Sequence, residues 1–361
     1  MSKSEIPKNH QYTENARGTV SWRSPSNIAL IKYWGKKGFQ IPSNPSLSMT
    51  LSDSFTETLV KYSLTQNPGT ISFDFYFEGA RKPQFGQKIA TFLETVSDIF
   101  PFLKNFHLEI HSRNTFPHSA GIASSASAMS ALALCLRSIE QQITGIENEN
   151  DEFLKKASNI ARIGSGSASR SIYGGYATWG KIASWEETSD LFASTLKTNI
   201  HPVFRDLRDT ILIISKNEKL VSSRAGHGLM VNHPFAEARI IQANHNLHEL
   251  LEYLDSGDFA GFIKVVENEA LTLHALMMAS NPGFVLIQPG TLQVIEKIRD
   301  FRKQTGANVV FTLDAGPNVH LLYPKHQTKL VKDFINDELI GFCDENKFID
   351  DKLGFGPQKL K

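Results

Sequence analysis

The sequence predicts an α+β fold, in which helices pack against an antiparallel sheet. Most segments before residue 80 alternate apolar and polar residues, as strands do, whereas apolar residues at helical spacing occur only after it. Beyond residue 208 a second series begins with an apolar strand and continues with helices and further strands. With 361 residues, 41% of them apolar, the chain is long enough for two domains or one large one.

Strands are expected to dominate the start of the chain. Residues 1–18 are polar and lack periodicity, so we expect a flexible arm. Residues 19–37 have the pattern of a strand that runs into the motif Lys-Tyr-Trp-Gly-Lys. Residues 55–64 and 70–79 both alternate and are separated by an Asn-Pro-Gly sequence, which predicts a β-hairpin.

Helices and strands are then expected to alternate. Apolar spacing predicts a helix over residues 86–98, and FHLEIHSRN at 106–114 predicts a strand. A helix over 151–162 is expected to run into a glycine- and serine-rich loop and strand at 164–180. The second half is expected to hold strands at 209–215, 308–315 and 318–324 and helices at 234–254, 258–279, 290–306 and 326–337.

The composition excludes several classes of function. The 38 basic and 37 acidic residues nearly cancel, so no overall charge favours nucleic acid or an anionic membrane. Cys135 and Cys343 form neither a disulfide framework nor a metal-ligand set. The polar start lacks the apolar core of a signal peptide, and no segment has the length of a membrane span. We therefore expect a soluble, cytoplasmic protein with a small-molecule partner.

One candidate anion site lies at the start of an alanine-rich helix. GIASSASAMSALAL begins at Gly121 and carries Ser124, Ser125 and Ser127 at the mouth of the helix. Helix N-termini offer unpaired N–H groups and the positive end of the helix dipole, and a glycine lets a phosphate approach the backbone. Serine is also a common N-cap residue. This segment alone leaves two interpretations open: a helix capped by a serine, or a phosphate-binding helix N-terminus that lacks the Walker lysine motif.

Three further segments hold candidate functional side chains. Lys32 and Lys36 flank two aromatic residues and a glycine, so they form either a solvated basic turn or two cations held by rigid rings. GSGSASRS at 164–171 contains Arg170, and arginine grips carboxylates and phosphates with paired hydrogen bonds. It follows a helix and lacks a third glycine, which argues against a dinucleotide fingerprint. Asp314 ends a strand before Ala-Gly-Pro and either stabilises that turn or orients a substrate hydroxyl.

Five segments, taken together, resemble the diphosphomevalonate decarboxylase family of the GHMP kinase superfamily. In chain order they are NIALIKYWGK, FPHSAGIASSAS, ARIGSGSASRSIYGG, KLVSSRAG and LDAGPNVHLL, and they lie between residues 20 and 325. The IKYWGK and SGSASRS segments resemble signatures that separate this family from its kinase relatives. Any one segment is modest evidence, but five in the family's order make a specific match.

The resemblance implies a two-domain GHMP kinase fold. A domain like the ribosomal protein S5 domain 2 type would span residues 19–205, a ferredoxin-like domain would span 206–361, and the active site would lie between them. The resemblance further implies a homodimer that uses ATP and Mg²⁺. Its substrate would be mevalonate 5-diphosphate, whose phosphorylation by ATP and decarboxylation yield isopentenyl diphosphate, ADP, phosphate and CO₂ in the mevalonate pathway of isoprenoid biosynthesis.

The resemblance also implies roles for individual residues. Asp314 matches the aspartate that orients the substrate's 3-hydroxyl, Arg170 matches the arginine that holds its carboxylate, and Asn27 matches the residue that steadies this arginine. Lys32 matches the lysine near the aspartate and the transferring phosphate. The residues matching the diphosphate site are Tyr33, Lys36, Ser165, Ser167, Ser223 and Arg224, and those matching the ATP-phosphate loop are Gly121, Ser124, Ser125 and Ser127. No metal ligand is implied beyond the ATP phosphates and a loop serine.

Three alternatives accompany this interpretation. The chain could be a kinase of the same superfamily that stops after phosphorylation, a decarboxylase of the monophosphate, or a non-catalytic ligand sensor. Asp314, Arg170 and Lys32 favour decarboxylation, and Tyr33, Lys36 and Arg224 favour the diphosphate. A sensor would be expected to have lost the aspartate or the phosphate loop.

Overall fold

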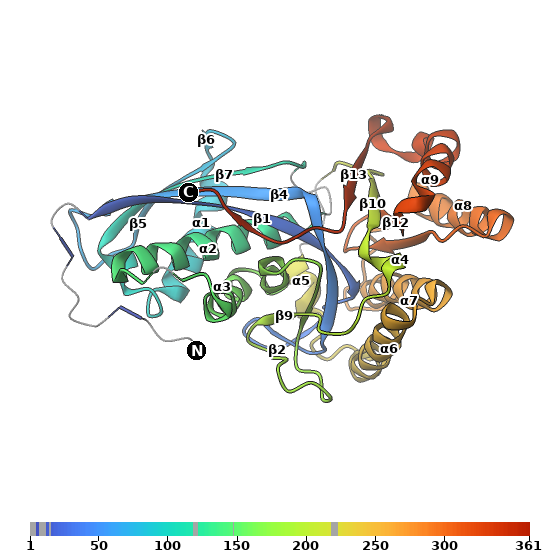
Figure 1. Cartoon of the computed structure of the whole chain (residues 1–361), viewed down its shortest axis with the longest axis horizontal. Helices are drawn as coiled ribbons and strands as arrows, with labels where there is room; N and C mark the ends of the chain where they lie inside the picture. The colour runs from blue at the N-terminus through green and yellow to red at the C-terminus, as the bar shows by residue number, and fades with distance from the viewer. Residues whose placement is uncertain (1–4, 7–11, 14–15, 118–121, 147, 218–222) are drawn as a thin grey trace.

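The strands form two principal sheets, and helices pack against both (Figure 1). The computed structural model describes residues 5–6, 12–13, 16–117, 122–146, 148–217 and 223–361. The first sheet has eight strands, with the order β14-β1-β4-β7-β5-β6 and with β8 and β9 added beside β4. The second has four strands in the order β11-β12-β10-β13. This mixture of helices and sheets confirms the predicted α+β class.

Two long strands form the backbone of the first sheet. β1 (Arg17–Ile31) and β4 (Ser46–Leu64) pair antiparallel along almost their whole length, with a register shift between Pro25 and Asn27. The remaining strands of this sheet are β5 (Ser72–Phe77), β6 (Ala80–Arg81), β7 (Phe106–Asn114), β8 (Tyr176–Trp179), β9 (Ala193–Thr195) and β14 (Gln358–Lys359). A separate two-stranded ribbon joins β2 (Lys36–Gly38) to β3 (Ile41–Pro42).

The predicted hairpin of residues 55–64 and 70–79 is wrong. β4 and β5 do form there, but β7 lies between them, antiparallel to β4 and parallel to β5. α1 (Pro83–Val96) connects β5 to β7, and a parallel pair needs such a crossover. The Asn-Pro-Gly sequence is a turn signal, but which strand pairs with which depends on distant apolar contacts that a local signal does not contain.

Three helices cover one face of the first sheet and bury its apolar side chains (Figure 1). They are α1, α2 (Ser124–Thr144) and α3 (Asp151–Gly164). The core between sheet and helices contains Leu108 and Ile110 of β7, Leu136 of α2 and Phe153 of α3. A short 3₁₀ helix, η2 (Gly166–Ile172), follows α3 directly and returns the chain to the sheet.

The second sheet is covered by helices on both faces. Its strands are β10 (Leu207–Leu212), β11 (Val310–Leu313), β12 (Val319–Pro324) and β13 (Phe348–Lys352). On one face Ile211 and Leu322 pack with α6 (Ala236–Ser256) and α7 (Phe259–Met278). On the other, α8 (Pro289–Thr305) and α9 (Thr328–Phe334) pack on Phe311 and its neighbours. Two further α-helices are short: α4 (Pro202–Arg205) and α5 (Ser223–Gly228).

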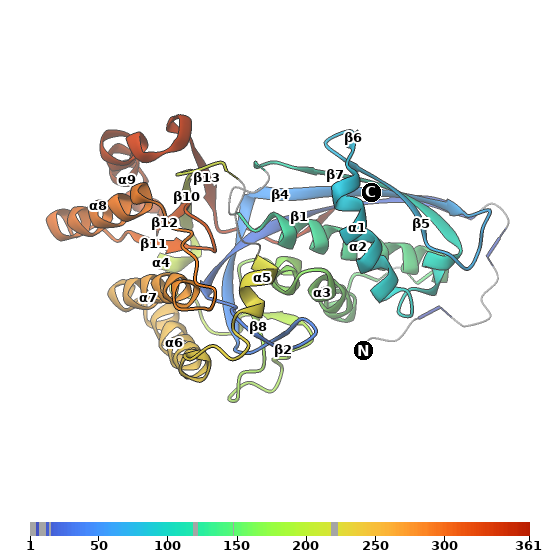
Figure 2. The same ribbon diagram turned by 180° about the vertical axis from the view of Figure 1, so that it is seen from behind.

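The two halves are joined tightly. Ile28 and Leu30 of β1 belong to the same core as the α6 and α7 side chains. Asp351 of β13 accepts hydrogen bonds from the backbone N–H groups of residues 52–54 at 2.7–2.9 Å. The last residues return to the first sheet, where β14 pairs with β1, and α5 lies between the halves in Figure 2. The domain boundaries at 18/19 and 205/206 stay predictions.

Parts of the expected flexible arm contact the fold. Ile6 is buried, the Glu5 carboxylate lies 2.7 Å from the Arg137 guanidinium, and the Tyr12 ring packs edge-on against Phe106 with centroids 5.0 Å apart. β1 begins at Arg17, inside the expected bounds of the arm, and the flexibility of residues 1–18 stays a prediction. Within the described part of the chain, no helix combines the length and the apolar character that crossing a membrane requires.

A buried carboxylate holds α2 against α3. Glu140 is fully buried and accepts hydrogen bonds from Arg137 at 2.6 Å and from Lys156 at 2.7 and 2.9 Å. Removing one partner from such a cluster lowers the stability of the fold, because the remaining charges stay buried without an opposite charge beside them.

We therefore expect Glu140→Gln to lower the free energy of unfolding by about 3–5 kcal/mol. Urea denaturation measures this change. The exposed pair of Lys297 and Glu338 serves as a control, since Glu338→Gln should cost less than about 1 kcal/mol. Equal effects of the two substitutions would show that the buried cluster contributes no more than a surface pair.

Candidate active site

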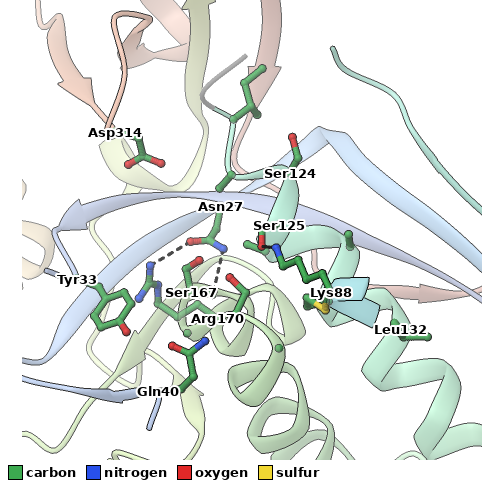
Figure 3. A pocket seen from close by; sticks show the side chains of 18 of the residues that line it. Asn27, Tyr33, Gln40, Lys88, Ser124, Ser125, Leu132, Ser167, Arg170 and Asp314 are labelled. Carbon is green, nitrogen blue, oxygen red and sulfur yellow. Dashed lines mark hydrogen bonds between the residues drawn. The ribbon is translucent and has the colours of Figure 1, made fainter. Parts of the chain in front are cut away.

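A cavity of about 550 Å³ lies where the two halves meet (Figure 3). Its walls come from the end of β1, the start of α2, the α3–η2 junction, α5, and the turn after β11. The structure therefore brings together segments far apart in sequence, including Lys32, Arg170 and Asp314, the first and last of which are 282 positions apart. Among the described residues, no group of three or more His, Cys, Asp or Glu side chains could hold a metal ion.

Arg170 is held rigidly at the bottom of the cavity. It lies on η2 and is 2% exposed. Its guanidinium donates to the hydroxyls of Ser48 at 2.9 Å and Ser46 at 2.6 Å. It also donates to Asn27 Oδ1 at 3.4 Å (Figure 3). Burial lowers the pKa of Arg170 to about 10, so the side chain is still charged at neutral pH. The cavity thus has a fixed cation whose protein partners are neutral.

Asn27 lies between this arginine and η2. Its amide donates to Ser171 Oγ at 2.8 Å and to the Ser167 carbonyl at 3.3 Å, which leaves its oxygen to accept from Arg170. Asn27 follows the register shift in β1, where the regular ladder with β4 is interrupted. The contact that the family resemblance implies between Asn27 and Arg170 is therefore present in the structure.

Lys32 and Asp314 form an ion pair across the cavity. The Lys32 ammonium lies 3.2 Å from Asp314 Oδ1 and also donates to the Ala29 carbonyl at 2.6 Å. The lysine side chain is 3% exposed, whereas the aspartate side chain is 24% exposed. Burial lowers the pKa of Lys32, and the Asp314 carboxylate opposes this shift. The pair presents an accessible carboxylate backed by a buried cation.

Tyr33 and His227 form an aromatic wall of the cavity. The His227 ring lies between Tyr33 and Trp34, with ring centroids 4.2 and 4.7 Å away. His227 Nδ1 accepts a hydrogen bond from the Gly35 N–H at 3.0 Å, so the neutral ring carries its proton on Nε2. Gly35 has a φ of 98°, which favours glycine. A Cβ on Gly166 would lie 2.8 Å from Tyr33, so glycine is required there too.

The N-terminus of α2 faces the cavity without a capping side chain. The N-cap residue is Ala123, in a left-handed conformation with a φ of 44°, and no side chain caps the helix. Within the described residues no serine caps α2, so the serine-cap interpretation is wrong. Ser124 and Ser125 line the cavity, and Lys88 of α1 donates to Ser125 Oγ at 3.0 Å (Figure 3).

Ser127 does not line the cavity. It is fully buried, and its hydroxyl lies 2.7 Å from Thr56 Oγ1 and donates to the Ser124 carbonyl at 3.3 Å. Its contacts join α2 to β4, so the structure gives it a supporting position beside the serines that face the cavity.

Beyond the serines the cavity continues into an apolar lobe. Its lining includes Phe75, Phe77, Phe85, Ile89, Ile110, Met129 and Leu132. These residues come from β5, β7, α1 and α2, and the polar groups Ser112 and Asn114 of β7 lie at its edge. The cavity is therefore divided into a cationic end and an apolar end, with the α2 N-terminus between them.

The remaining predicted residues divide into two groups. Lys36, Ser165 and Ser167 line the cationic end. Gly121 lies outside the described residues, and so do the side chains of Ser223 and Arg224, although both residues begin α5. Lys88, Gln40 and His227 also line the cavity, although no sequence pattern pointed to them. No spacing signal marks these three, because each lies alone among residues of another pattern.

The buried imidazole makes acid stability testable. Burial, and then repulsion by Lys36 and Arg170, lowers the pKa of His227 from 6.5 to about 3. As the pH falls below 6.5, the unfolded chain binds a proton that the folded chain does not, so the fold loses stability between pH 6.5 and about 3. The loss that His227 contributes at about pH 4.5 is about 2–3 kcal/mol.

We therefore expect His227→Gln to lose less stability than the natural chain when the pH falls from about 6.5 to about 4.5. Urea denaturation at both pH values measures the difference. His248, an exposed histidine of α6, is the matched control, and His248→Gln should follow the natural chain. Identical pH dependence of all three proteins would contradict a neutral buried His227.

Comparisons with known proteins agree with this architecture. Residues 24–191 match the sequence model of the diphosphomevalonate decarboxylase-like N-terminal domain, and residues 210–353 match that of the mevalonate 5-diphosphate decarboxylase C-terminal domain. The diphosphomevalonate decarboxylase of Gibberella zeae is 30% identical over 332 residues, covering 86% of this chain and 82% of its own. The human diphosphomevalonate decarboxylase is 27% identical and covers 85% and 77%.

Solved structures are similar over nearly the whole chain. The mevalonate diphosphate decarboxylase from Staphylococcus aureus has a TM-score of 0.81 at 31% identity, covering 96% of this chain and 99% of its own. A structure named MDDEF, in complex with MVAPP, AMPPCP and magnesium, has a TM-score of 0.79 at 29% identity, covering 96% and 100%. Together with the two domain matches, these similarities show that the chain belongs to the diphosphomevalonate decarboxylase family.

Proposed function

We propose that the protein catalyses the ATP-dependent decarboxylation of mevalonate 5-diphosphate to isopentenyl diphosphate, with release of ADP, phosphate and CO₂. The observation that carries this proposal is the arrangement of one cavity: Lys32, Arg170 and Asp314 lie at one end, and the uncapped N-terminus of α2 points into its middle. A ligand with several negative charges fits this arrangement, because cations and helix dipole offset the repulsion between its groups.

The cationic end suits the mevalonate diphosphate. Arg170 would hold the carboxylate, since the partners that the described residues provide for its guanidinium are the neutral side chains of Ser48, Ser46 and Asn27. Asp314 would face the tertiary 3-hydroxyl, with Lys32 beside it. The side chains that would surround the diphosphate are Tyr33, Lys36, Ser165 and Ser167, joined by Ser223 and Arg224 as the family resemblance implies.

The other end suits a nucleotide. The aromatic and aliphatic side chains of the apolar lobe can enclose a flat base, and the α2 N-terminus, Ser124 and Ser125 can bind its phosphates. Lys88 reaches the same place. The MDDEF complex with AMPPCP and magnesium supports this assignment. Mg²⁺ bound to the ATP phosphates and a loop serine would neutralise charge during phosphoryl transfer.

The chemistry then follows from these positions. Asp314 accepts or orients the proton of the 3-hydroxyl, whose oxygen forms a bond to the γ-phosphorus of ATP while the bond to ADP breaks. Loss of the new phosphate from C3 creates positive charge there. The electrons of the breaking bond between C2 and the carboxylate form the C2–C3 double bond, and CO₂ leaves. Arg170 holds the carboxylate in place, and the scheme needs no electron-accepting cofactor.

The first experiment measures products from two substrates. With Mg-ATP and mevalonate 5-diphosphate, the purified protein is expected to release CO₂ and ADP in equal amounts, and to act poorly on mevalonate 5-phosphate. ADP without CO₂ would identify a kinase, and equal rates on both substrates would refute the assignment of the diphosphate. Nucleotide binding without turnover of either substrate would identify a sensor. Light scattering of the same sample tests the expected homodimer.

The second experiment removes the carboxylate. We expect Asp314→Asn to reduce kcat by about 10²- to 10⁴-fold, because a positioned general base typically contributes that much. The affinity for ATP, measured by calorimetry, should stay nearly unchanged, since the apolar lobe and the α2 N-terminus are intact. Asp337→Asn, at an exposed position, is the control. Near-normal turnover by Asp314→Asn would show that Asp314 does not have this role.

A further inference from the structure

The two members of the central ion pair come from different sheets. Lys32 directly follows β1 of the first sheet, and Asp314 directly follows β11 of the second. Their 3.2 Å contact therefore depends on how the two halves are held together. The side chains of the pair do not fix this distance by themselves, because an ion pair tolerates movement of a flexible lysine.

The backbone of Lys32 is held by a buried ion pair from the other half. Its N–H donates to Glu269 Oε2 of α7 at 2.8 Å, and its carbonyl accepts from Arg239 Nη2 of α6 at 3.0 Å. Asn44 donates to the same carbonyl at 3.0 Å. Side chains therefore bind both the N–H and the carbonyl of Lys32. Two of these three side chains, Glu269 and Arg239, belong to helices of the second half.

The pair that makes these contacts is itself almost completely buried. The side chains of Glu269 and Arg239 are 0% and 1% exposed, and two hydrogen bonds of 2.6 and 2.7 Å join them. Asn246 donates to Glu269 Oε1 at 2.6 Å. A buried ion pair is weak evidence for stability, because apolar side chains of similar volume often pack as well. The distinguishing feature of this ion pair is that both of its side chains also form hydrogen bonds with the backbone of Lys32.

The same helix holds the backbone of Asp314. His274, also on α7 and 2% exposed, donates from Nε2 to the Asp314 carbonyl at 3.0 Å. Glu269 and His274 lie five residues apart, little more than one turn of α7. One rigid helix therefore contacts the main chain of both partners in the ion pair.

We propose that α7 positions the catalytic pair, with Glu269, assisted by Arg239, placing Lys32 and with His274 placing Asp314. These three are positioning residues, since none of them lies among the residues that line the cavity. The inference deepens the proposed function and rests on it: the reaction would depend on a contact that the second half imposes on the first.

Substitutions that keep or remove each hydrogen bond test this inference. Glu269→Leu and His274→Phe remove the bonds, whereas Glu269→Gln and His274→Gln keep an acceptor or a donor. Misplacing catalytic groups by about 1 Å can lower the reaction rate about 100-fold. We therefore expect Glu269→Leu and His274→Phe to lower kcat by about 10- to 100-fold, and the two Gln variants to retain more activity. The KM for ATP should change by less than about twofold.

Glu267 offers a matched control on the same helix. It is 8% exposed and pairs with Arg302 of α8, away from Lys32 and Asp314. Glu267→Gln should lower stability, measured by urea denaturation, without lowering kcat. If Glu267→Gln lowered kcat as much as Glu269→Leu at equal loss of stability, or if Glu269→Leu and His274→Phe kept full kcat, the inference would be wrong.

A second measurement does not depend on turnover. The Lys32 side chain is 3% exposed, so its amine should react slowly with an acylating reagent when the labelled peptides are analysed by mass spectrometry. Glu269→Leu should speed this reaction, and Glu267→Gln should not. If the natural protein released no CO₂, the proposed function would fail while the labelling still tested the positioning. Unchanged labelling in Glu269→Leu would overturn the positioning itself.

Discussion

The structure depends on burying two basic side chains, Lys32 and Arg170, in one cavity. Lys32 and Arg170 are 2% exposed each, and moving such ions out of water costs several kcal/mol unless hydrogen bonds replace the water. For Arg170 the replacement comes mainly from the hydroxyls of Ser46 and Ser48, which are neutral. For Lys32 it comes from the Ala29 carbonyl and from Asp314. Asp314 pairs with Lys32, but the hydroxyls around Arg170 carry no charge. An anionic ligand would therefore balance the positive charge of Arg170.

The long β1–β4 ladder makes this arrangement possible. β1 extends from the core beneath α2 and α3 into the core that α6 and α7 share, so one strand carries groups to both halves. The register shift near Asn27 occurs where the strand passes the cavity. Since β14 and β13 tie the end of the chain back to β1 and β4, the halves are braced on both sides of the site.

Local patterns succeeded where the information they needed was local. The helices at 151–162, 234–254, 258–279 and 290–306 form close to the expected bounds, because an apolar stripe at helical spacing has to face a core whatever the topology. The same patterns were wrong about the hairpin, because β7 enters between two strands that are neighbours in sequence. They left a serine cap on α2 and an anion site both open, and the structure decides against the cap because Ala123 occupies the N-cap position in a left-handed conformation.

The sequence by itself determined the family to which the chain belongs and the side chains that match the family's motifs. Five segments contain the lysines, serines, arginine and aspartate, and their order implied the family before any contact was known. Only the tertiary structure decided that Lys32, Arg170 and Asp314 share a cavity, that Ser127 faces β4, and that Lys88 and His227 join the lining. The buried contacts of Glu269 and His274 lie in an ordinary amphipathic helix. A helical pattern specifies which face is buried, but packing chooses the partner on that face, which for Glu269 is Lys32, 237 positions away.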